Sequence, residues 1–234
     1  WVWHVADLLN SGQVRELCHA VRPTHLLHLA WYTTHADYWT SPENFRWVQA
    51  SQDLLQQFCR HGGQRAVMAG TCAEYDWRAG TLSESTTPLC PRSTYGSCKK
   101  EMFCWLDEFS RQNGLSSAWA RVFFLYGPHE PPQRLVPAVV SALLRDEPAR
   151  CTAGAQIRDY LYVEDVAGAL ACLLAGGVTG AVNVASGKPT HIRDLVVTIA
   201  DKLNRRDLLQ LGAIPEKADD PPVLVADVRR LSHE

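Results

Sequence analysis

Residues 65–125 decide the fold, because RAVMA (Arg65–Ala69) and SAWARVFFL (Ser117–Leu125) flank TYGSCKKEMFCWLDEFSRQN (Thr94–Asn113). The outer runs are short and apolar, as in buried strands, whereas the twenty residues between them have the length of a helix. Gly114 follows that helix as a C-cap, because glycine readily adopts the left-handed conformation that closes a helix. The strand–helix–strand order predicts parallel strands covered by helices.

The same alternation continues on both sides of this stretch. Before it, the pattern predicts strands at Val2–Val5 and Leu26–Ala30 and helices at Val14–Val21 and Pro42–His61. After it, the pattern predicts helices at Leu135–Leu144, Asp165–Ala175 and Ile192–Leu203, an extended segment at Arg158–Val163 and a strand at Ala181–Val184. We therefore expect an α/β fold with a mostly parallel sheet and helices on both faces.

Composition limits the classes of partner. The chain has 234 residues, 46% of them hydrophobic and 21% charged, with a net charge of −2. These values are ordinary for a globular protein and suggest neither nucleic acid nor an anionic membrane surface as partner. The longest apolar run, Leu135–Leu144, is too short to cross a bilayer. The eight cysteines form no Cys-x-x-Cys pair and have no histidine at zinc-ligand spacing, so we expect reduced thiols in a cytoplasmic protein and no metal site.

Tyr95 and Lys99 lie four residues apart, on one face of the predicted helix. A phenol ordinarily titrates near pH ~10, and a fixed positive charge beside it favours the phenolate. The pair is therefore a candidate proton shuttle, with Thr71 upstream as a hydroxyl partner. The alternative interpretation is a surface tyrosine and lysine on an amphipathic helix.

One motif is absent near the start of the chain, where neither Gly-x-Gly-x-x-Gly nor Gly-x-x-Gly-x-x-Gly occurs. A dinucleotide site normally has such a turn after its first strand, because backbone N–H groups there meet the pyrophosphate.

Several segments together resemble the extended short-chain dehydrogenase/reductase family, in particular its nucleotide-sugar epimerases, dehydratases and reductases. The likeness covers nearly the whole chain, and its segments occur in family order. They are Asp7-Leu8, His28-Leu29-Ala30, Thr71, Tyr95 with Lys99, Arg121–Pro128 (RVFFLYGP), Arg158–Val166 (RDYLYVEDV) and Asn183–Gly187 (NVASG).

The resemblance implies hydride transfer coupled to proton transfer, with NAD or NADP as cofactor. Tyr95 would exchange a proton with a sugar hydroxyl or keto oxygen. Lys99 would bias Tyr95 toward the phenolate and bind the nicotinamide ribose. Thr71 would hydrogen-bond the same substrate oxygen as Tyr95.

It also implies binding residues. Asp7 and Leu8 would hold adenine, and the rest of the cofactor would contact Leu29, Ala30, Tyr95, Lys99 and Val122. Substrate would contact Thr71, Phe124, Arg134 and Arg158. Arg158 would grip a diphosphate, since a guanidinium fork suits phosphate oxygens. Its alternative role is a salt bridge with Asp159 or Glu164, and Phe124 stands where the family has asparagine.

Dehydratases of the family place a carboxyl residue one or two positions after the threonine. Cys72 and Ala73 occupy those positions here, which argues against loss of water from the sugar. Glu74 comes one step later, and in an extended chain one step reverses the direction of the side chain.

Neighbouring residues stay open to more than one interpretation. The aromatic run Trp31, Tyr32, Tyr38 and Trp39 predicts either a wall for a sugar or base or a packed loop. His129 and Glu130 are candidates for lining the cleft, without an assigned role.

On this resemblance the chain begins late, with Val2–Val5 as the third strand and two β-α units upstream. The expectation is therefore either a fragment or a naturally shortened protein. Residues 1–128 would form a dinucleotide-binding Rossmann-like core without its first β-α units. Residues 129–234 would be mainly a small substrate-binding part, with some segments returning to the core.

The resulting prediction is an NAD(P)-dependent enzyme acting on a nucleotide-linked sugar, as epimerase or 4-keto reductase. The alternatives are a non-catalytic dinucleotide-binding sensor or scaffold, and a reductase of a small carbonyl compound. Relatives commonly pair through helices equivalent to Pro42–His61 and Thr94–Asn113, which implies a homodimer.

Overall fold

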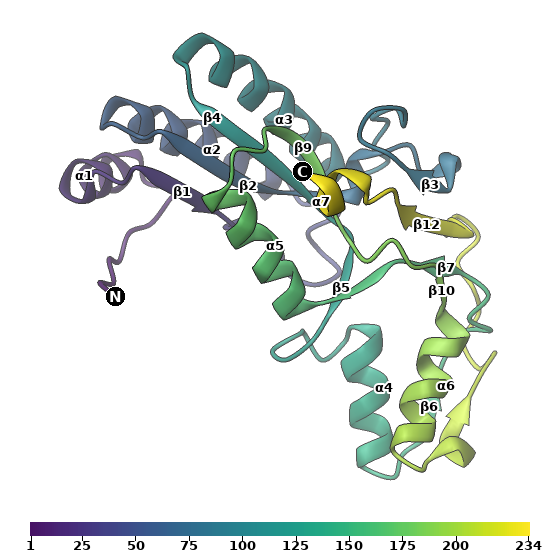
Figure 1. The fold of residues 1–234 in the computed structure, drawn as a ribbon. Helices are drawn as coiled ribbons and strands as arrows, with labels where there is room; N and C mark the ends of the chain where they lie inside the picture. Colours follow the sequence, from purple (N-terminus) through teal and green to yellow (C-terminus); the bar gives the residue numbers. More distant parts are fainter.

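The computed structural model describes residues 1–234 and has an α/β architecture built on a four-stranded parallel sheet (Figure 1). The strands are β1 (His25–His28), β2 (Arg65–Thr71), β4 (Ser116–Val122) and β9 (Gly180–Val184), in the order β1-β2-β4-β9. Each neighbouring pair is parallel. Since parallel strands need crossovers, helices cover both faces of the sheet.

Alternation along β2 assigns each face of the sheet to its helices. Met68 packs in one cluster with residues of α2 (Glu43–Arg60) and α3 (Thr94–Asn113). Val67, one residue earlier, points the other way and packs with residues of α5 (Val163–Ala175). Helix α1 (Ser11–Val21) packs beside α2 through Val14, Cys18 and Leu54. The predicted helices on both faces are therefore confirmed.

The start of α3 is fixed by a side-chain cap. Ser93 Oγ accepts a hydrogen bond from the Gly96 N–H at 3.1 Å, which satisfies one of the free donors of the first turn. At the other end Gly114 has φ 64, and its N–H donates to the Ser110 carbonyl. These two caps set the helix at Thr94–Asn113, as the sequence predicts.

A second region is built mainly from residues that follow β4, together with β3 from before it. Its elements form a four-stranded sheet in the order β10-β7-β12-β3, two two-stranded pairs (β5 with β8, β6 with β11) and two packed helices. The strands are β3 (Thr81–Leu82), β5 (Phe124–Tyr126), β6 (Ala149–Arg150), β7 (Ile157–Arg158), β8 (Tyr160–Tyr162), β10 (Thr190–His191), β11 (Leu209–Gln210) and β12 (Val223–Ala226). The two packed helices are α4 (Leu135–Leu144) and α6 (Ile192–Lys202). Elsewhere in the chain, α7 (Arg229–His233) packs against β9, and 3₁₀ turns lie at Cys72–Glu74, Trp77–Ala79 and Arg206–Leu208. Figure 1 shows α4 and α6 side by side, away from the parallel sheet.

Two predicted strands differ in the structure. Val2–Val5 is not a strand: it precedes α1 without pairing, and Val2 and Val5 are 82% and 103% exposed. It has no strand beside it, since β1 is the edge of the sheet and pairs only with β2. The predicted strand Ser117–Leu125 is interrupted at Phe123, whose N–H donates to the Val184 carbonyl at 3.1 Å. This break turns Phe124 out of the parallel sheet and into the β5–β8 pair.

No helix of the fold combines the length and the apolar character needed to cross a membrane. All eight cysteines are unpaired. The boundary between 128 and 129 stays a prediction, although α5 and β9 come from beyond it and join the parallel sheet.

Candidate active site

A cavity of about 680 Å³ opens at the carboxyl ends of the parallel strands. Leu29 lines it just after β1, Gly70 and Thr71 line it at the end of β2, and Val122 lines it at the end of β4. In open α/β sheets this edge is the usual place for a ligand. The cavity also brings in Tyr95 and Lys99 from α3 and a set of residues from the second region.

Thr71 is the last residue of β2 and the N-cap of the turn that follows. Its backbone N–H donates to Glu74 Oε1 at 2.8 Å, and its hydroxyl accepts from the Ala73 N–H at 3.2 Å. These two reciprocal bonds form a capping box, which fixes the Thr71 side chain because it is bonded to the backbone of the turn. Since the hydroxyl oxygen accepts locally, its proton is left to donate toward the cavity.

Tyr95 lies beside Thr71, against the aromatic loop that precedes α2. Its ring meets those of Tyr38 and Trp39 edge-to-face, with centroids 5.0 and 5.8 Å away. Burial raises the pKa of the Tyr95 phenol above its ordinary value, and a hydrogen bond with Thr71 opposes that rise. We expected Lys99 to bias Tyr95 toward the phenolate. In the fold, burial instead favours the neutral phenol.

Lys99 is 4% exposed, and its Nζ donates to the Ala69 carbonyl at 2.8 Å. The ammonium lies 3.7 Å from the centroid of the Trp31 ring and 6.0 Å from that of Tyr95. Burial lowers the pKa of Lys99 to about 7, and the charge of Glu74 opposes this fall. The three predicted catalytic residues thus line one cavity, with Thr71 and Tyr95 in closer contact than Tyr95 and the Lys99 charge.

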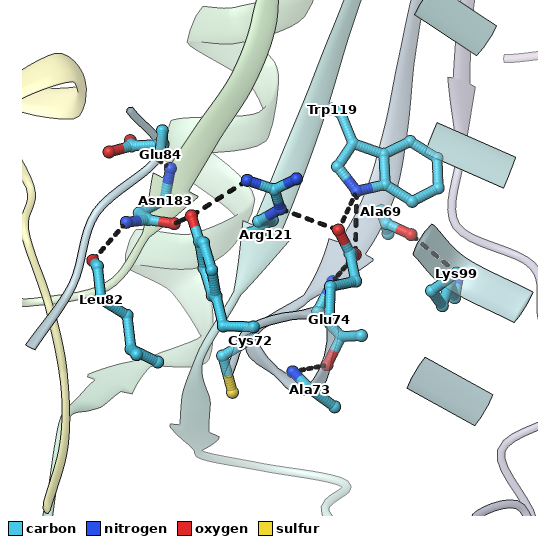
Figure 2. Close-up of polar contacts among 12 residues, drawn as sticks. Ala69, Cys72, Ala73, Glu74, Leu82, Glu84, Lys99, Trp119, Arg121 and Asn183 are labelled. Carbon is cyan, nitrogen blue, oxygen red and sulfur yellow. Dashed lines mark hydrogen bonds and ion pairs between the residues drawn. The ribbon is translucent and has the colours of Figure 1, made fainter. Parts of the chain in front are cut away.

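Glu74 does not line the cavity, and Figure 2 shows its carboxylate directed toward Trp119 and Arg121. Its carboxylate is fully buried, 2.7 Å from Arg121 Nε, and also accepts from Trp119 Nε1 at 2.9 Å. Arg121 in turn donates to the Tyr75 hydroxyl, which donates to Asn183 Oδ1 at 2.8 Å. This network joins β2, β4 and β9, so Glu74 is not available as an acid for a bound sugar.

The predicted cofactor residues divide into two groups. Leu29 and Val122 line the cavity together with Tyr95 and Lys99. Asp7, Leu8 and Ala30 do not line it. The Asp7 carboxylate accepts from the Leu9 N–H at 2.9 Å, and Leu8 packs against the cluster between α1 and α2.

The predicted substrate residues all line the cavity: Thr71 from the end of β2, and Phe124, Arg134 and Arg158 from the second region. Arg158 is 5% exposed there, and its Nη2 lies 2.6 Å from Asp220 Oδ1. Its partner is therefore neither Asp159 nor Glu164. Asp159 is buried and accepts from the N–H groups of Ser186 and Gly187 at 2.8 and 2.9 Å.

Arg134 and Phe124 also line the part of the cavity that the second region forms. Arg134 precedes α4, and its charge opposes the burial-driven rise in the pKa of Tyr38. The Phe124 ring lies 5.6 Å from the Arg158 guanidinium and 5.7 Å from the Tyr160 ring. The position where the family has asparagine thus presents an apolar surface beside a cation.

Sequence reasoning missed Asp220 and Lys217, which line the same end. They belong to the segment between β11 and β12, where no periodicity or motif marks them. The only signal was an acidic pair before two prolines, Asp219 to Pro222. Of the open candidates, Trp31, Tyr38, Trp39, His129 and Glu130 line the cavity, whereas Tyr32 hydrogen-bonds Asp37 outside it.

Comparisons with known proteins agree with this architecture. Residues 2–185 match the family described as the NAD dependent epimerase/dehydratase family. An ADP-L-glycero-D-manno-heptose-6-epimerase of Nitratidesulfovibrio vulgaris is 28% identical over 180 residues, which cover 70% of this chain and 55% of that relative. The chain thus spans just over half the length of this relative.

Solved structures extend the likeness to the whole fold. A UDP-N-acetylglucosamine 4-epimerase of Methanobrevibacter ruminantium, in complex with UDP-N-acetylmuramic acid, matches with a TM-score of 0.88 at 22% identity, covering 97% of this chain and 74% of that one. MoeE5, solved with UDP-glucose and NAD, matches with a TM-score of 0.83 at 28% identity, covering 97% and 77%. The extent of the family match, over most of the chain, places this protein in the NAD dependent epimerase/dehydratase family.

Proposed function

We propose that this chain functions as an NAD(P)-dependent epimerase or 4-keto reductase acting on a nucleotide-linked sugar. The observation that carries the proposal is one cavity lined by Thr71, Tyr95 and Lys99 and also by Arg158. A proton-transfer group and a phosphate-binding group on one cavity suit a substrate with a reactive sugar and a diphosphate. The solved complex of MoeE5 with UDP-glucose and NAD supports this choice of ligands.

The donor set fits the nicotinamide end of a dinucleotide. The Lys99 ammonium, the Tyr95 phenol and the Thr71 hydroxyl lie at the carboxyl edge of the sheet, beside the apolar side chains of Leu29 and Val122. When bound, the cofactor would supply the hydride acceptor or donor. Asp7, Leu8 and Ala30 stay proposed adenine-side or cofactor contacts, supported by their match to family segments and not by this cavity.

The proton step belongs to Tyr95 Oη. Because burial raises the pKa of this phenol, it carries its proton when a keto oxygen arrives and donates it there. Thr71, whose hydroxyl hydrogen-bonds Tyr95, orients the same oxygen. No carboxyl group follows Thr71 in the cavity, since Cys72 and Ala73 line it and Glu74 is paired with Arg121, so we do not propose dehydration.

Tyr95→Phe tests the proposal directly. The variant keeps the ring contacts and removes the proton donor, so turnover of nucleotide 4-keto sugars with NAD(P)H should fall about 10²–10⁴-fold. Calorimetry with NAD(H), NADP(H) and nucleotide sugars should give unchanged affinities. Tyr162→Phe, which removes a phenol hydroxyl outside the cavity, is a matched control.

Two results would contradict the enzyme assignment. Binding without any turnover that depends on Tyr95 would favour a sensor or scaffold. Turnover of small carbonyl compounds that is unchanged in an Arg158→Ala variant would favour a reductase whose substrate carries no nucleotide.

We also propose a homodimer that pairs through α2 and α3, and a cytoplasmic location. The two helices pack side by side on one face of the sheet, where Phe45 is 59% exposed and Trp105 stacks on Phe109. Sedimentation of the protein and of a Phe45→Glu variant tests the pairing. The eight unpaired thiols are consistent with a reducing compartment.

A further inference from the structure

The Lys99 ammonium is enclosed by aromatic rings. Its Nζ lies 3.7 Å from the centroid of Trp31, 5.9 Å from that of Trp119 and 6.0 Å from that of Tyr95. One N–H is taken by the Ala69 carbonyl at 2.8 Å. Glu74, the carboxylate whose charge reaches Lys99, is held by Arg121 at 2.7 Å. The cation is therefore stabilised by ring faces and a carbonyl where buried lysines usually have an acidic partner.

Trp31 is held in this position by α2. Its Nε1 donates to Asn44 Oδ1 at 2.8 Å. Asn44 is fully buried, and its Nδ2 donates to the carbonyls of Tyr38 and Ser41 at 2.7 and 2.9 Å. Both the oxygen and the nitrogen of the Asn44 amide are hydrogen-bonded, so Asn44 fixes the edge of the Trp31 indole. The face of the same indole contacts the Lys99 ammonium.

We propose that Trp31 is a positioning residue of the site, whose ring face, fixed by Asn44, holds Lys99 against Ala69 and keeps it cationic. The inference rests on the proposed role of Lys99 beside Tyr95. It assigns a purpose to the first member of the aromatic run, which the family resemblance leaves without one. Trp31 touches neither of the proton-transfer hydroxyls in the contacts described, and it acts through Lys99.

The other groups that face Lys99 leave this role to the ring. His28 on β1 stays neutral, because burial and the Lys99 charge lower its pKa to about 4. Tyr95 on α3 is held neutral by burial. Glu74, after β2, favours the ammonium but is shared with Arg121 and Trp119. Since burial lowers the pKa of Lys99 to about 7, a small loss of stabilisation is enough to neutralise it.

The test compares an aliphatic with an aromatic replacement. Trp31→Leu keeps apolar bulk and excludes water but removes the ring quadrupole, whereas Trp31→Phe keeps a ring face. The pH dependence of Lys99 acylation by acetic anhydride, read by peptide mass mapping on the whole chain without ligand, gives its titration midpoint. Lys100, whose Nζ bonds the Leu89 carbonyl, is the internal reference, and Trp105→Leu is the control variant.

We expect the midpoint of Lys99 in Trp31→Leu to fall by about one unit relative to wild type, a roughly tenfold fall in the ratio of protonated to neutral lysine. Trp31→Phe and Trp105→Leu should stay within about half a unit. Trp31→Met, another non-aromatic filler, takes the place of Trp31→Leu if that variant does not fold. Equal midpoints in the non-aromatic and the phenylalanine variants would overturn the proposal.

Turnover gives the second readout. In the non-aromatic variant the alkaline limb of the turnover–pH profile should move down with the Lys99 midpoint, and Trp31→Phe should restore it. The acylation result needs neither substrate nor cofactor. A protein that turns over no nucleotide sugar would therefore count against the proposed function, and unshifted acylation would count against Trp31 alone.

Discussion

Arg158 pairs with Asp220 in this fold. Its proposed contact with a substrate phosphate can be measured by substituting the arginine. Arg158→Ala should weaken binding of UDP or dTDP about tenfold or more, because a charge-assisted hydrogen bond contributes about 1.5–3 kcal/mol. Arg158→Lys should lie between, since lysine keeps the charge and loses the fork. Calorimetry with the free nucleoside diphosphates is the measurement, and Arg78→Ala, an exposed pair with Asp76, is the control. If Arg158→Ala and the control bind UDP or dTDP with equal affinity, Arg158 does not bind the phosphate.

Glu74 illustrates the cost of one buried charge. Glu74→Gln should lower the free energy of unfolding by about 3–5 kcal/mol, because it leaves the buried Arg121 guanidinium without its counterion. Arg121 Nη2 already has no partner, so nothing nearby compensates. Urea titration checks this, against Arg46→Ala, whose exposed pair with Glu43 should contribute about 0–1 kcal/mol. A loss of similar size in both variants would contradict the account.

The helix α3 presents Tyr95 and Lys99 from its first turns, so its N-cap belongs to the site. Ser93→Ala removes the acceptor for the Gly96 N–H and should lower the free energy of unfolding by about 1 kcal/mol. Fraying of that turn should also lower turnover, because it moves the Tyr95 ring. Thermal unfolding and turnover are measured together, and Ser93→Asp should restore both. Loss of stability with full turnover would show that the cap does not position Tyr95.

Helix and strand boundaries were predictable where local chemistry fixes them. Gly114 marks the end of α3, and the apolar runs of β2 and β4 are long enough to recognise as strands. Val2–Val5 was misread, because its apolar residues look like a strand while pairing depends on a neighbour elsewhere in the chain. The break at Phe123 was missed for the same reason, since it depends on β9 accepting a hydrogen bond.

The site was predictable only in part. Thr71, Tyr95, Lys99 and Arg158 lie in motifs, and the structure brings them to one cavity. The partners of these residues are distant in sequence: Arg121 is 47 residues from Glu74, and Asp220 is 62 residues from Arg158. Neither pairing leaves a local pattern. The raised pKa of Tyr95 also depends on burial by Tyr38 and Trp39, which spacing along α3 does not reveal.

The response of the protein to acid should depend on His28. Burial holds its pKa at about 4 in the fold, against 6.5 for the unperturbed group, so between these values the unfolded chain binds the extra proton. Stability should therefore fall as the pH drops through this window, by on the order of 3 kcal/mol from this residue. His28→Gln keeps a hydrogen-bonding group for Ser51 and should flatten the decline. Urea titrations at several pH values measure it, with His35→Gln as an exposed control, and an unchanged slope would refute the role of His28.

The parallel sheet draws its last strand, β9, and the helix under its far face, α5, from beyond residue 128. A gene cut at that point would leave the first product with Val67, Ala118 and Ala120 uncovered on one side, and with Tyr75 missing its Asn183 partner. Neither product is then a self-sufficient unit, however natural the break looks from motifs alone. If the chain is divided there, we expect the pieces to fold only when both are synthesised together.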